Sequence, residues 1–432
     1  ILDDVRLAHG FLCASRTRLV VLRRCEAFKP QINQTRQFRG FRHAYVFIIP
    51  VMSKAQHSER LDHIDAMRAI AVILVIWTHY AERFVALAGS QRVLDTLQRS
   101  LNFGRIGVVL FFAISGMLIP TSLHGEVGVG TKRFLVRRFL RLYPAYWLAL
   151  PAGYFVHWYL FDKRMDIHGF LANVTMIPVA FGESLILPHG WTLETELYFY
   201  GVCLILFWCG ALHRMLHLCL VTVGLCGLFV LPLEFRLFPA HLLSQYKTLP
   251  YHLGIMFWGA CFRMAYDNPS KPLRIRPAGS GVLSRLSLTY RSAVAYVTIP
   301  VVGIALAGAI TDWRNHNTFH LPISLAYMIG IATFAMLATL LKLRIRLLSW
   351  IGKISYSIYL LHSLPLFLAF WLCQRFHIVG WPLGLYMIVP LVPLIPLSWV
   401  GYRLCEAPFV KLAHTLTSRR GSRVFASGDA TS

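Results

Sequence analysis

The stretch Ile64–Leu87 reads IDAMRAIAVILVIWTHYAERFVAL and decides the fold. From Ala69 to Trp77 it is an unbroken apolar run, and the whole stretch reaches the roughly 20 residues that a helix needs to cross a bilayer. Arg68 precedes the run, and His79 follows it while the helix should still lie within the bilayer. An ionisable side chain at this depth is costly unless it faces a protein or water-lined interior, so His79 is a candidate functional residue.

Arg68 and His79 are eleven positions apart, which is close to three turns at about 3.6 residues per turn. Both side chains should therefore project from one face of the helix, about 16 Å apart along its axis. Each residue alone has a plainer explanation. Arg68 can be a charged anchor at the helix end, and His79 can form a structural hydrogen bond to a neighbouring helix. Their common face favours a functional pair.

The composition indicates a protein that crosses a membrane several times. The chain has 432 residues, of which 56% are hydrophobic and 14% charged, whereas soluble domains carry about a quarter charged residues. The net charge of +24 would suggest nucleic-acid binding in a soluble protein. Here the basic residues lie in short loops beside apolar runs, where they set topology and meet anionic lipid, so we expect no nucleic-acid partner. The nine cysteines show no CxxC pair and no regular spacing to histidines, and we expect no metal site.

Ten apolar segments predict an all-α, polytopic membrane bundle of about ten transmembrane helices. They are residues 64–87, 106–123, 140–160, 192–210, 215–232, 250–266, 293–310, 321–341, 354–373 and 381–404. The alternate loops on one side of the membrane hold 22 Lys and Arg residues, and those on the other side hold 10. Because cytoplasmic loops are enriched in positive charge, both termini and Arg68 are predicted to be cytoplasmic.

The ends of the chain differ from the apolar middle. Residues 1–51 hold nine Lys and Arg residues, begin with Ile and contain no run long enough to span a membrane. We expect this segment to be a basic upstream extension, disordered or absent in the working protein. Residues 52–412 should form the membrane domain, and residues 413–432 a basic and polar tail.

A second polar stretch, Thr131–Trp147, reads TKRFLVRRFLRLYPAYW and begins in a predicted cytoplasmic loop. Arg138 and Arg141 are three positions apart, so they are neighbours on a helix surface. Such a pair can hold a phosphate group through forked, charge-assisted hydrogen bonds. Anchoring of the helix on the cytoplasmic side explains the same charges without any ligand.

A third stretch, His189–Tyr200, reads HGWTLETELYFY and opens the fourth predicted span from the outside. Glu194 and Glu196 are two positions apart, so they should point to different sides of the helix and cannot both face one site. One carboxylate can be interfacial, and the other requires a partner or a wet cavity. A further stretch, Ser349–Leu366, contributes His362.

Six blocks of the chain, in order, resemble the integral-membrane acyltransferase-3 family, which includes O-antigen and exopolysaccharide O-acetyltransferases. The blocks are DAMRAIA (65–71) with His79, GVVLFFAISG (107–116), RFLRLYP (138–144), WTLETELYFY (191–200), SYSIYLLH (355–362) and EAPF (406–409). The first is similar to the family's D-G-L-R-G-I-A block with its R-x10-H signature, and the third and fourth to R-x-x-R-x-Y-P and W-S-L-x-x-E-x-x-F-Y. The likeness covers about residues 61–412. Among the departures, Val109 stands where the family often has Asp, Leu197 replaces a frequent second Glu, and Glu194 is extra.

The resemblance implies a membrane O-acyltransferase in a bacterial inner membrane. Its donor would be a cytoplasmic acyl-CoA, with acetyl-CoA expected, and its acceptor a hydroxyl of an extracytoplasmic sugar or polysaccharide. Arg68, Arg138 and Arg141 would hold the CoA phosphates. His79 would act as a general base or accept the acyl group itself. Glu196 would orient or charge-balance His79, or contact the sugar.

The alternative is a membrane transporter or flippase of a glycan or an acyl-carrying substrate. Ten helices, a buried histidine and buried carboxylates also occur in such proteins. However, the two halves of the sequence show no repeat and no paired broken helices, which transporters of this kind often have.

Overall fold

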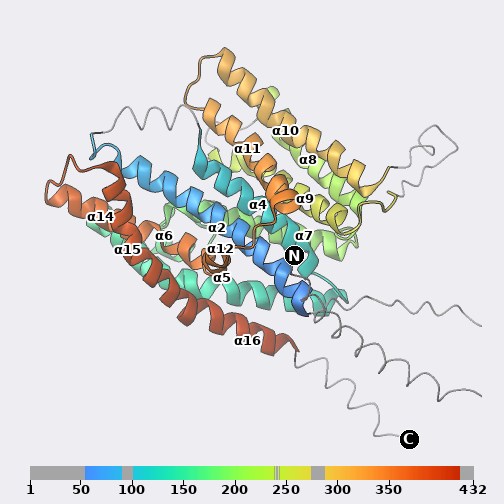
Figure 1. Ribbon diagram of the computed structural model, residues 1–432, viewed down its shortest axis with the longest axis horizontal. Helices are drawn as coiled ribbons and strands as arrows, with labels where there is room; N and C mark the ends of the chain where they lie inside the picture. The colour runs from blue at the N-terminus through green and yellow to red at the C-terminus, as the bar shows by residue number, and fades with distance from the viewer. Residues whose placement is uncertain are drawn as a thin grey trace, which may run out of the picture. The chain divides into compact units, whose positions relative to one another are not determined.

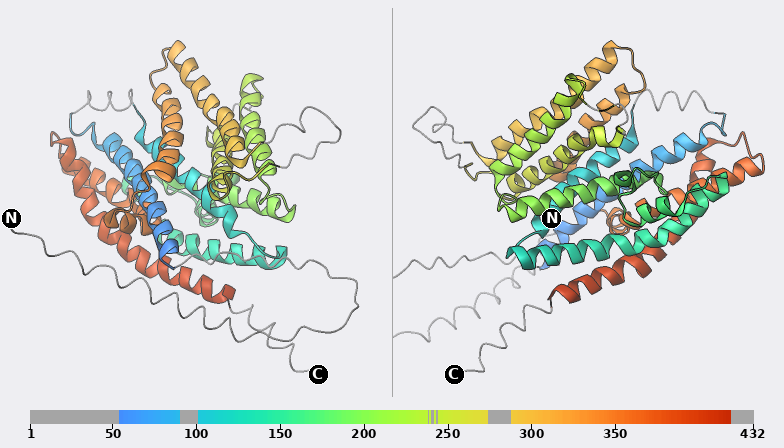
Figure 2. Two further views of the ribbon diagram at one scale, coloured as in Figure 1. Left: turned by 45° about the vertical axis from the view of Figure 1, so that its right-hand side comes forward. Right: turned by 180° about the vertical axis from the view of Figure 1, so that it is seen from behind.

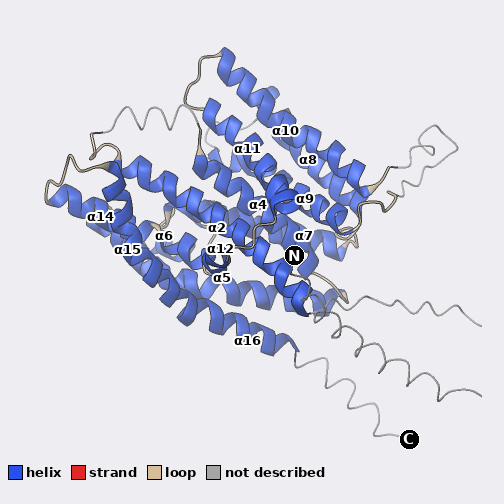
Figure 3. Cartoon of the chain, in the orientation of Figure 1, coloured by secondary structure: helices blue, strands red, loops and turns tan. Residues whose placement is uncertain are grey.

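In the computed structural model, the described residues are 54–89, 101–237, 239, 242, 244–273 and 288–418. They form helices and turns, with an isolated β-bridge between Pro272 and Thr289 and no strand among them (Figure 3). The all-α prediction is therefore confirmed for this part of the chain. The expected extension 1–51 lies outside the described residues, as does the expected tail from residue 419 onward. The beginning of that tail belongs to α16 (Ala407–Ser418).

Long helices joined by shorter ones make up the rest of the described chain (Figure 1). The long helices are α2 (Lys54–Phe84), α4 (Phe103–Ser122), α5 (Val127–His157), α7 (Trp191–Trp208), α8 (Met215–Glu234), α9 (Ser244–Asp267), α10 (Tyr290–Arg314), α11 (Leu321–Met336), α14 (Ser363–Arg375) and α15 (Leu383–Gly401). The short helices and helical turns are η1 (Tyr159–Phe161), α6 (Ile167–Val174), η2 (Pro178–Phe181), η3 (Pro188–Gly190), η5 (Leu337–Leu341), α12 (Arg346–Lys353), α13 (Ser355–Leu361) and η6 (Tyr402–Glu406). Each of the ten predicted apolar segments coincides with one of these helices or with a consecutive pair.

Within the part of the chain that the structure describes, seven helical segments are long and apolar enough to cross a membrane. They are Asp62–Phe84, Phe103–Ser122, Met215–Glu234, Tyr290–Arg314, Leu321–Leu341, Ser355–Arg375 and Leu383–Ser418. The other three predicted spans form α5, α7 and α9, in which polar and charged side chains interrupt the apolar residues; α5 holds five Lys and Arg residues between Lys132 and Arg141. A helical membrane bundle is supported, and the count of ten spans stays a prediction.

Helix α2, which contains the stretch quoted first, lies between two groups of helices (Figures 1 and 2). On one side it packs against α4, which in turn contacts α9 and α11, with α8 and α10 beside them. On the other side it packs against α12, α13 and α15, and α14, α5 and α16 continue this group. Small buried residues on α2, including Ala66, Ala69 and Ala71, allow close packing. A Cβ atom on Gly107 of α4 would lie 2.5 Å from the carbonyl oxygen of Ala71, so only glycine fits there.

The chain leaves regular helix at His362, between α13 and α14. Pro365 explains the break, because it has no N–H to donate and its ring clashes with the carbonyl of Leu361, four residues earlier. The hydroxyl of Tyr80, on α2, donates a hydrogen bond to the carbonyl oxygen of His362 at 3.0 Å. The break is therefore tied directly to the central helix, one residue after His79 along α2.

Candidate functional site

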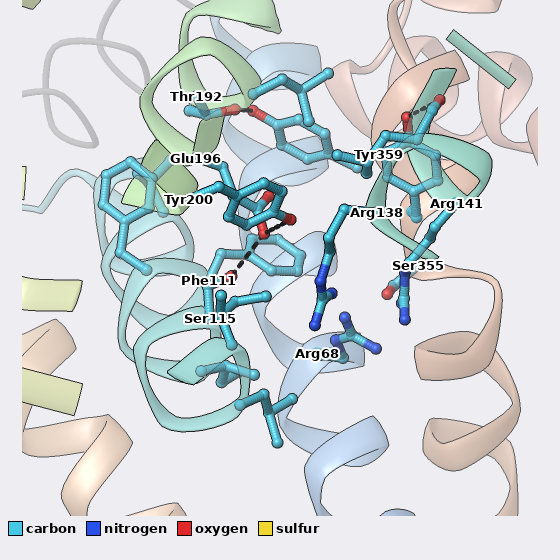
Figure 4. Close-up of a pocket in the computed structure, with 18 of the residues that line it drawn as sticks. Arg68, Phe111, Ser115, Arg138, Arg141, Thr192, Glu196, Tyr200, Ser355 and Tyr359 are labelled. Atoms are coloured by element: carbon cyan, nitrogen blue, oxygen red, sulfur yellow. Dashed lines mark hydrogen bonds between the residues drawn. The ribbon is translucent and has the colours of Figure 1, made fainter. Parts of the chain in front are cut away.

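A cavity of about 290 Å³ lies between α2, α4, α5, α7 and α13, and we call it the arginine cavity. Three guanidinium groups face it: that of Arg68 from α2, and those of Arg138 and Arg141 from α5 (Figure 4). Glu196 of α7 lines the same cavity. The three cations that the resemblance assigns to one ligand are thus brought together by the fold from two separate stretches of sequence.

The three guanidinium groups are held in different ways. Arg68 forms an ion pair with Asp65, one turn earlier, at 3.9 Å between nitrogen and oxygen. Arg138 donates to the hydroxyl of Ser122 at 3.1 Å and stacks over two aromatic rings. No hydrogen bond or ion pair joins Arg141 to any other described residue. The planar donors of Arg141 therefore remain available to a ligand in the cavity.

The two carboxylates of α7 point to different places, as their spacing predicts. The Oε1 atom of Glu196 accepts hydrogen bonds from the hydroxyls of Ser115, at 3.2 Å, and Tyr200, at 2.8 Å. Glu194 is fully buried and does not line the arginine cavity; its Oε1 accepts hydrogen bonds from the hydroxyls of Tyr198, on α7, and Tyr246, on α9. Of the two α7 carboxylates, Glu196 is therefore the one that lines the arginine cavity, which Asp65 of α2 lines as well.

A second cavity, also of about 290 Å³, is lined by three histidines, and we call it the imidazole cavity. His79 comes from α2, His189 from η3 and His362 from the break between α13 and α14. Glu82 and Arg83, which follow His79 on α2, supply one charge of each sign. The cavity thus combines three imidazoles with a carboxylate and a guanidinium group.

The ring of His362 is close to both other imidazoles. Its centroid lies 5.5 Å from that of His79, against which it stacks, and 4.6 Å from that of His189. His362 Nδ1 lies 2.6 Å from the carbonyl oxygen of Tyr359, and His189 Nε2 lies 3.2 Å from that of Leu360. Because a carbonyl oxygen can only accept, each of these nitrogens carries a proton and the other nitrogen of each neutral ring has a free lone pair.

The linings of the two cavities share no residue, but their walls touch. Thr192 and Tyr359 line the arginine cavity, and His189 lines the imidazole cavity. The hydroxyls of Thr192 and Tyr359 contact each other, and each lies 3.1 Å from the carbonyl oxygen of His189. Arg68 and His79 therefore line different cavities, whose walls touch at these hydroxyls.

The structure divides the predicted site residues into two groups. Arg68, Arg138, Arg141 and Glu196 line the arginine cavity, and His79 lines the imidazole cavity. Glu196 does not line the imidazole cavity. A role of Glu196 that requires direct contact with His79 therefore has no support in these linings.

Sequence reasoning did not single out the charged neighbours of His79 or the role of His189. Arg83 lies four positions after His79, one helical turn away, so helix periodicity could have placed it beside the histidine. His189 had no such signal, because its position depends on how η3 packs against the break at His362.

Comparison with known proteins agrees with this architecture. The sequence profile of the Acyltransferase domain family matches residues 61–403. ORF330 of Acidianus two-tailed virus, named as an acetyltransferase, is 26% identical over 274 residues, which are 60% of this chain and 73% of the viral protein. YrhL of Bacillus subtilis (strain 168), named as a peptidoglycan O-acetyltransferase, is 28% identical over 167 residues, 34% of this chain and 24% of YrhL. Protein 2 in the picA locus of Rhizobium radiobacter is 27% identical over 162 residues, 32% of this chain and 78% of that protein. No solved structure matches the chain.

Every residue that we have placed in the lining of either cavity falls within the residues that the family profile matches. The chain belongs to the acyltransferase-3 family and is a membrane acyltransferase.

Proposed function

We propose that this enzyme moves an acetyl group from cytoplasmic acetyl-CoA to a hydroxyl of a sugar or polysaccharide on the other side of the membrane. The observation that supports this most is the pairing of two cavities along α2. Arg68 faces the arginine cavity, and His79, about three turns later, faces the imidazole cavity. A donor that carries phosphates at one end and a thioester at the other suits this arrangement.

The arginine cavity has the chemistry to hold the phosphate end of the donor. Arg68, Arg138 and Arg141 supply planar donors that match phosphate oxygens in pairs. The rise of about 16 Å along α2 from Arg68 to His79 is comparable to the length of a pantetheine arm. The thioester end would pass the contact between Thr192 and Tyr359 to reach the imidazole cavity.

His79 is the residue that we assign to the chemistry of transfer. A neutral imidazole can take the proton of a hydroxyl, or it can attack the thioester carbon and carry the acyl group itself. His79 is exposed to the imidazole cavity, so a donor and an acceptor can both approach it. Glu196 lines the arginine cavity. From there it would balance the charge of the three arginines and orient the donor.

The acceptor would enter the imidazole cavity from the extracytoplasmic side. The name of YrhL, a peptidoglycan O-acetyltransferase, favours a glycan hydroxyl as the acceptor. The excess of Lys and Arg in one set of loops supports cytoplasmic termini and an arginine cavity open to the cytoplasm. A bacterial inner membrane, crossed about ten times, is the location that we propose.

The experiment is release of free CoA from acetyl-CoA by detergent-purified protein, measured with a thiol reagent. We expect the wild type to release CoA and His79→Ala to be slower by at least about 100-fold, the usual effect of removing an acid-base or nucleophilic group. His320→Ala, which removes an exposed histidine at the start of α11, is the matched control and should keep wild-type activity.

A His79→Ala protein that keeps more than about a tenth of the wild-type rate would contradict the assignment of His79. A wild type that neither releases CoA nor binds it would contradict the proposed donor.

A further inference from the structure

The three histidines of the imidazole cavity differ in how their ring nitrogens are engaged. No hydrogen bond joins the ring of His79 to another described residue, and the side chain is exposed to the cavity. A ring with accessible nitrogens and no fixed proton is suited to attack a carbonyl carbon. It is less suited to be a general base, which needs a defined tautomer and orientation.

A hydrogen bond fixes the tautomer of His362, whereas none to a described residue fixes that of His79. Its Nδ1 proton is held by the carbonyl oxygen of Tyr359 at 2.6 Å, so the lone pair lies on Nε2. The side chain is 1% exposed and belongs to the lining of the imidazole cavity, where it stacks on His79. A buried imidazole with one nitrogen held by an acceptor and the other free is the usual arrangement of a general base.

The backbone at His362 is also held in place. Tyr80, the neighbour of His79 on α2, donates to the carbonyl oxygen of His362 at 3.0 Å. The break at Pro365 removes this backbone from regular helix, and the ring of His189 packs 4.6 Å from that of His362 on another side. Several contacts therefore hold the two stacked imidazoles together.

We propose that His362 is a second catalytic residue, whose Nε2 takes the proton of the acceptor hydroxyl while His79 carries the acyl group. This inference rests on the function proposed above. It divides between two residues the roles that sequence reasoning left open for His79 alone.

With the roles divided in this way, the transfer takes two steps, in which atoms and charges balance. First, a ring nitrogen of His79 attacks the thioester carbon. A C–N bond forms, the C–S bond breaks, and the leaving thiolate takes the remaining N–H proton of His79. Second, the acceptor oxygen attacks the same carbon and its proton passes to His362 Nε2. A C–O bond forms, the C–N bond breaks, and His362 returns the proton to His79, so both rings end neutral.

The first step can be measured without any acceptor, as exchange of radiolabel between free CoA and acetyl-CoA in purified protein. His362→Asn is the informative variant, because its amide N–H can replace Nδ1–H toward Tyr359 but leaves no base in the place of Nε2. We expect His362→Asn to exchange label within about threefold of the wild type, and His79→Gln to exchange none.

The second step is measured as acetate formed by transfer to water and as acetohydroxamate formed with added hydroxylamine, against blanks without protein. Water must lose a proton as it attacks, whereas hydroxylamine attacks as a neutral amine and depends far less on a base. We expect His362→Asn to lose at least about 100-fold in acetate formation but less than tenfold in hydroxamate formation. His377→Asn, the same substitution at an exposed histidine that lines neither cavity, should match the wild type.

Each other outcome is decisive. If His362→Asn loses exchange and hydrolysis equally, or neither, His362 is not the base for the second step. A wild type that hydrolyses acetyl-CoA but exchanges no label would overturn the acyl-carrying role of His79 and leave the proposed function standing. A wild type that does neither, and forms no hydroxamate, would overturn the proposed function itself.

Discussion

At the scale of single residues, the arginine cavity holds three cations with unequal freedom. Arg68 is paired with Asp65, and Arg138 is held by Ser122 and by aromatic rings. Arg141 has no such partner among the described residues, so its donors are open to a bound phosphate group. Because a ligand gains most from donors that are not already engaged, Arg141 should contribute strongly to donor binding.

We predict that Arg141→Ala raises the KM for acetyl-CoA by about 10- to 100-fold, since a charge-assisted hydrogen bond is worth about 1.5–3 kcal/mol. The KM for S-acetyl-N-acetylcysteamine, a thioester without phosphates, should hardly change. Steady-state rates of CoA and thiol release with the two donors measure the difference.

Arg133→Ala is the matched control for this prediction. Arg133 lies on the same basic stretch of α5, donates to the carbonyl oxygen of His124 and does not line the arginine cavity. Its removal should leave both KM values near those of the wild type. If Arg141→Ala raised the KM values for the two donors equally, Arg141 would not bind the phosphates.

At the scale of elements, the cavities depend on helices that approach closely at glycines. A Cβ atom on Gly116 of α4 would lie 1.8 Å from the carbonyl oxygen of Met256 on α9. One on Gly259 of α9 would lie 2.4 Å from the carbonyl oxygen of Ala113 on α4. Small residues of this kind let helix backbones pack directly in membrane proteins. Helix α4 also carries Ser115, which binds Glu196, so its position sets one wall of the arginine cavity.

We predict that Gly116→Ala lowers the thermal stability of the detergent-purified protein, because the methyl group forces α4 and α9 apart. Overpacking of this kind costs about 1–3 kcal/mol, and a decrease of several degrees in the apparent melting temperature is expected. Gly224→Ala on α8 is the control, since no atom lies within 4 Å of its added Cβ. Equal melting temperatures for the two variants would argue against a tight α4–α9 contact.

At the scale of the whole molecule, the proposed reaction requires one cavity to face each side of the membrane. The arginine cavity contains residues from α5, whose first half carries the densest group of basic residues in the described chain. From the positive-inside rule we predict that this end faces the cytoplasm and that the loop between α10 and α11 lies outside. The proposed direction of transfer depends on that orientation.

We predict that Thr318→Cys, in the exposed loop between α10 and α11, reacts with a membrane-impermeant maleimide in intact cells. The native Cys209, exposed after α7, should react only after the cells are permeabilised. Mass spectrometry of the purified protein identifies the labelled cysteine. Labelling of Cys209 in intact cells would reverse the proposed orientation.

Features that depend on residues close together along the chain could be predicted from the sequence, and features that depend on contacts between distant residues could not. The apolar runs predicted the long helices, because bilayer thickness and the helix rise set a length that a sequence displays directly. Helix periodicity also predicted that Arg138 and Arg141 are neighbours and that Glu194 and Glu196 diverge. The count of ten spans was less direct, because α5, α7 and α9 mix apolar and charged residues and their burial depends on neighbouring helices.

The grouping of residues from distant stretches was decided by tertiary structure alone. The sequence places Arg68 and His79 on one helix, but only packing shows that they line different cavities. His189 and His362 reach His79 because of the break at Pro365 and the contacts that hold it. Such contacts depend on helix crossings and on single backbone hydrogen bonds between elements, which leave no periodic pattern in the sequence. The local chemistry of this enzyme is therefore encoded helix by helix, and its candidate site exists only where the helices meet.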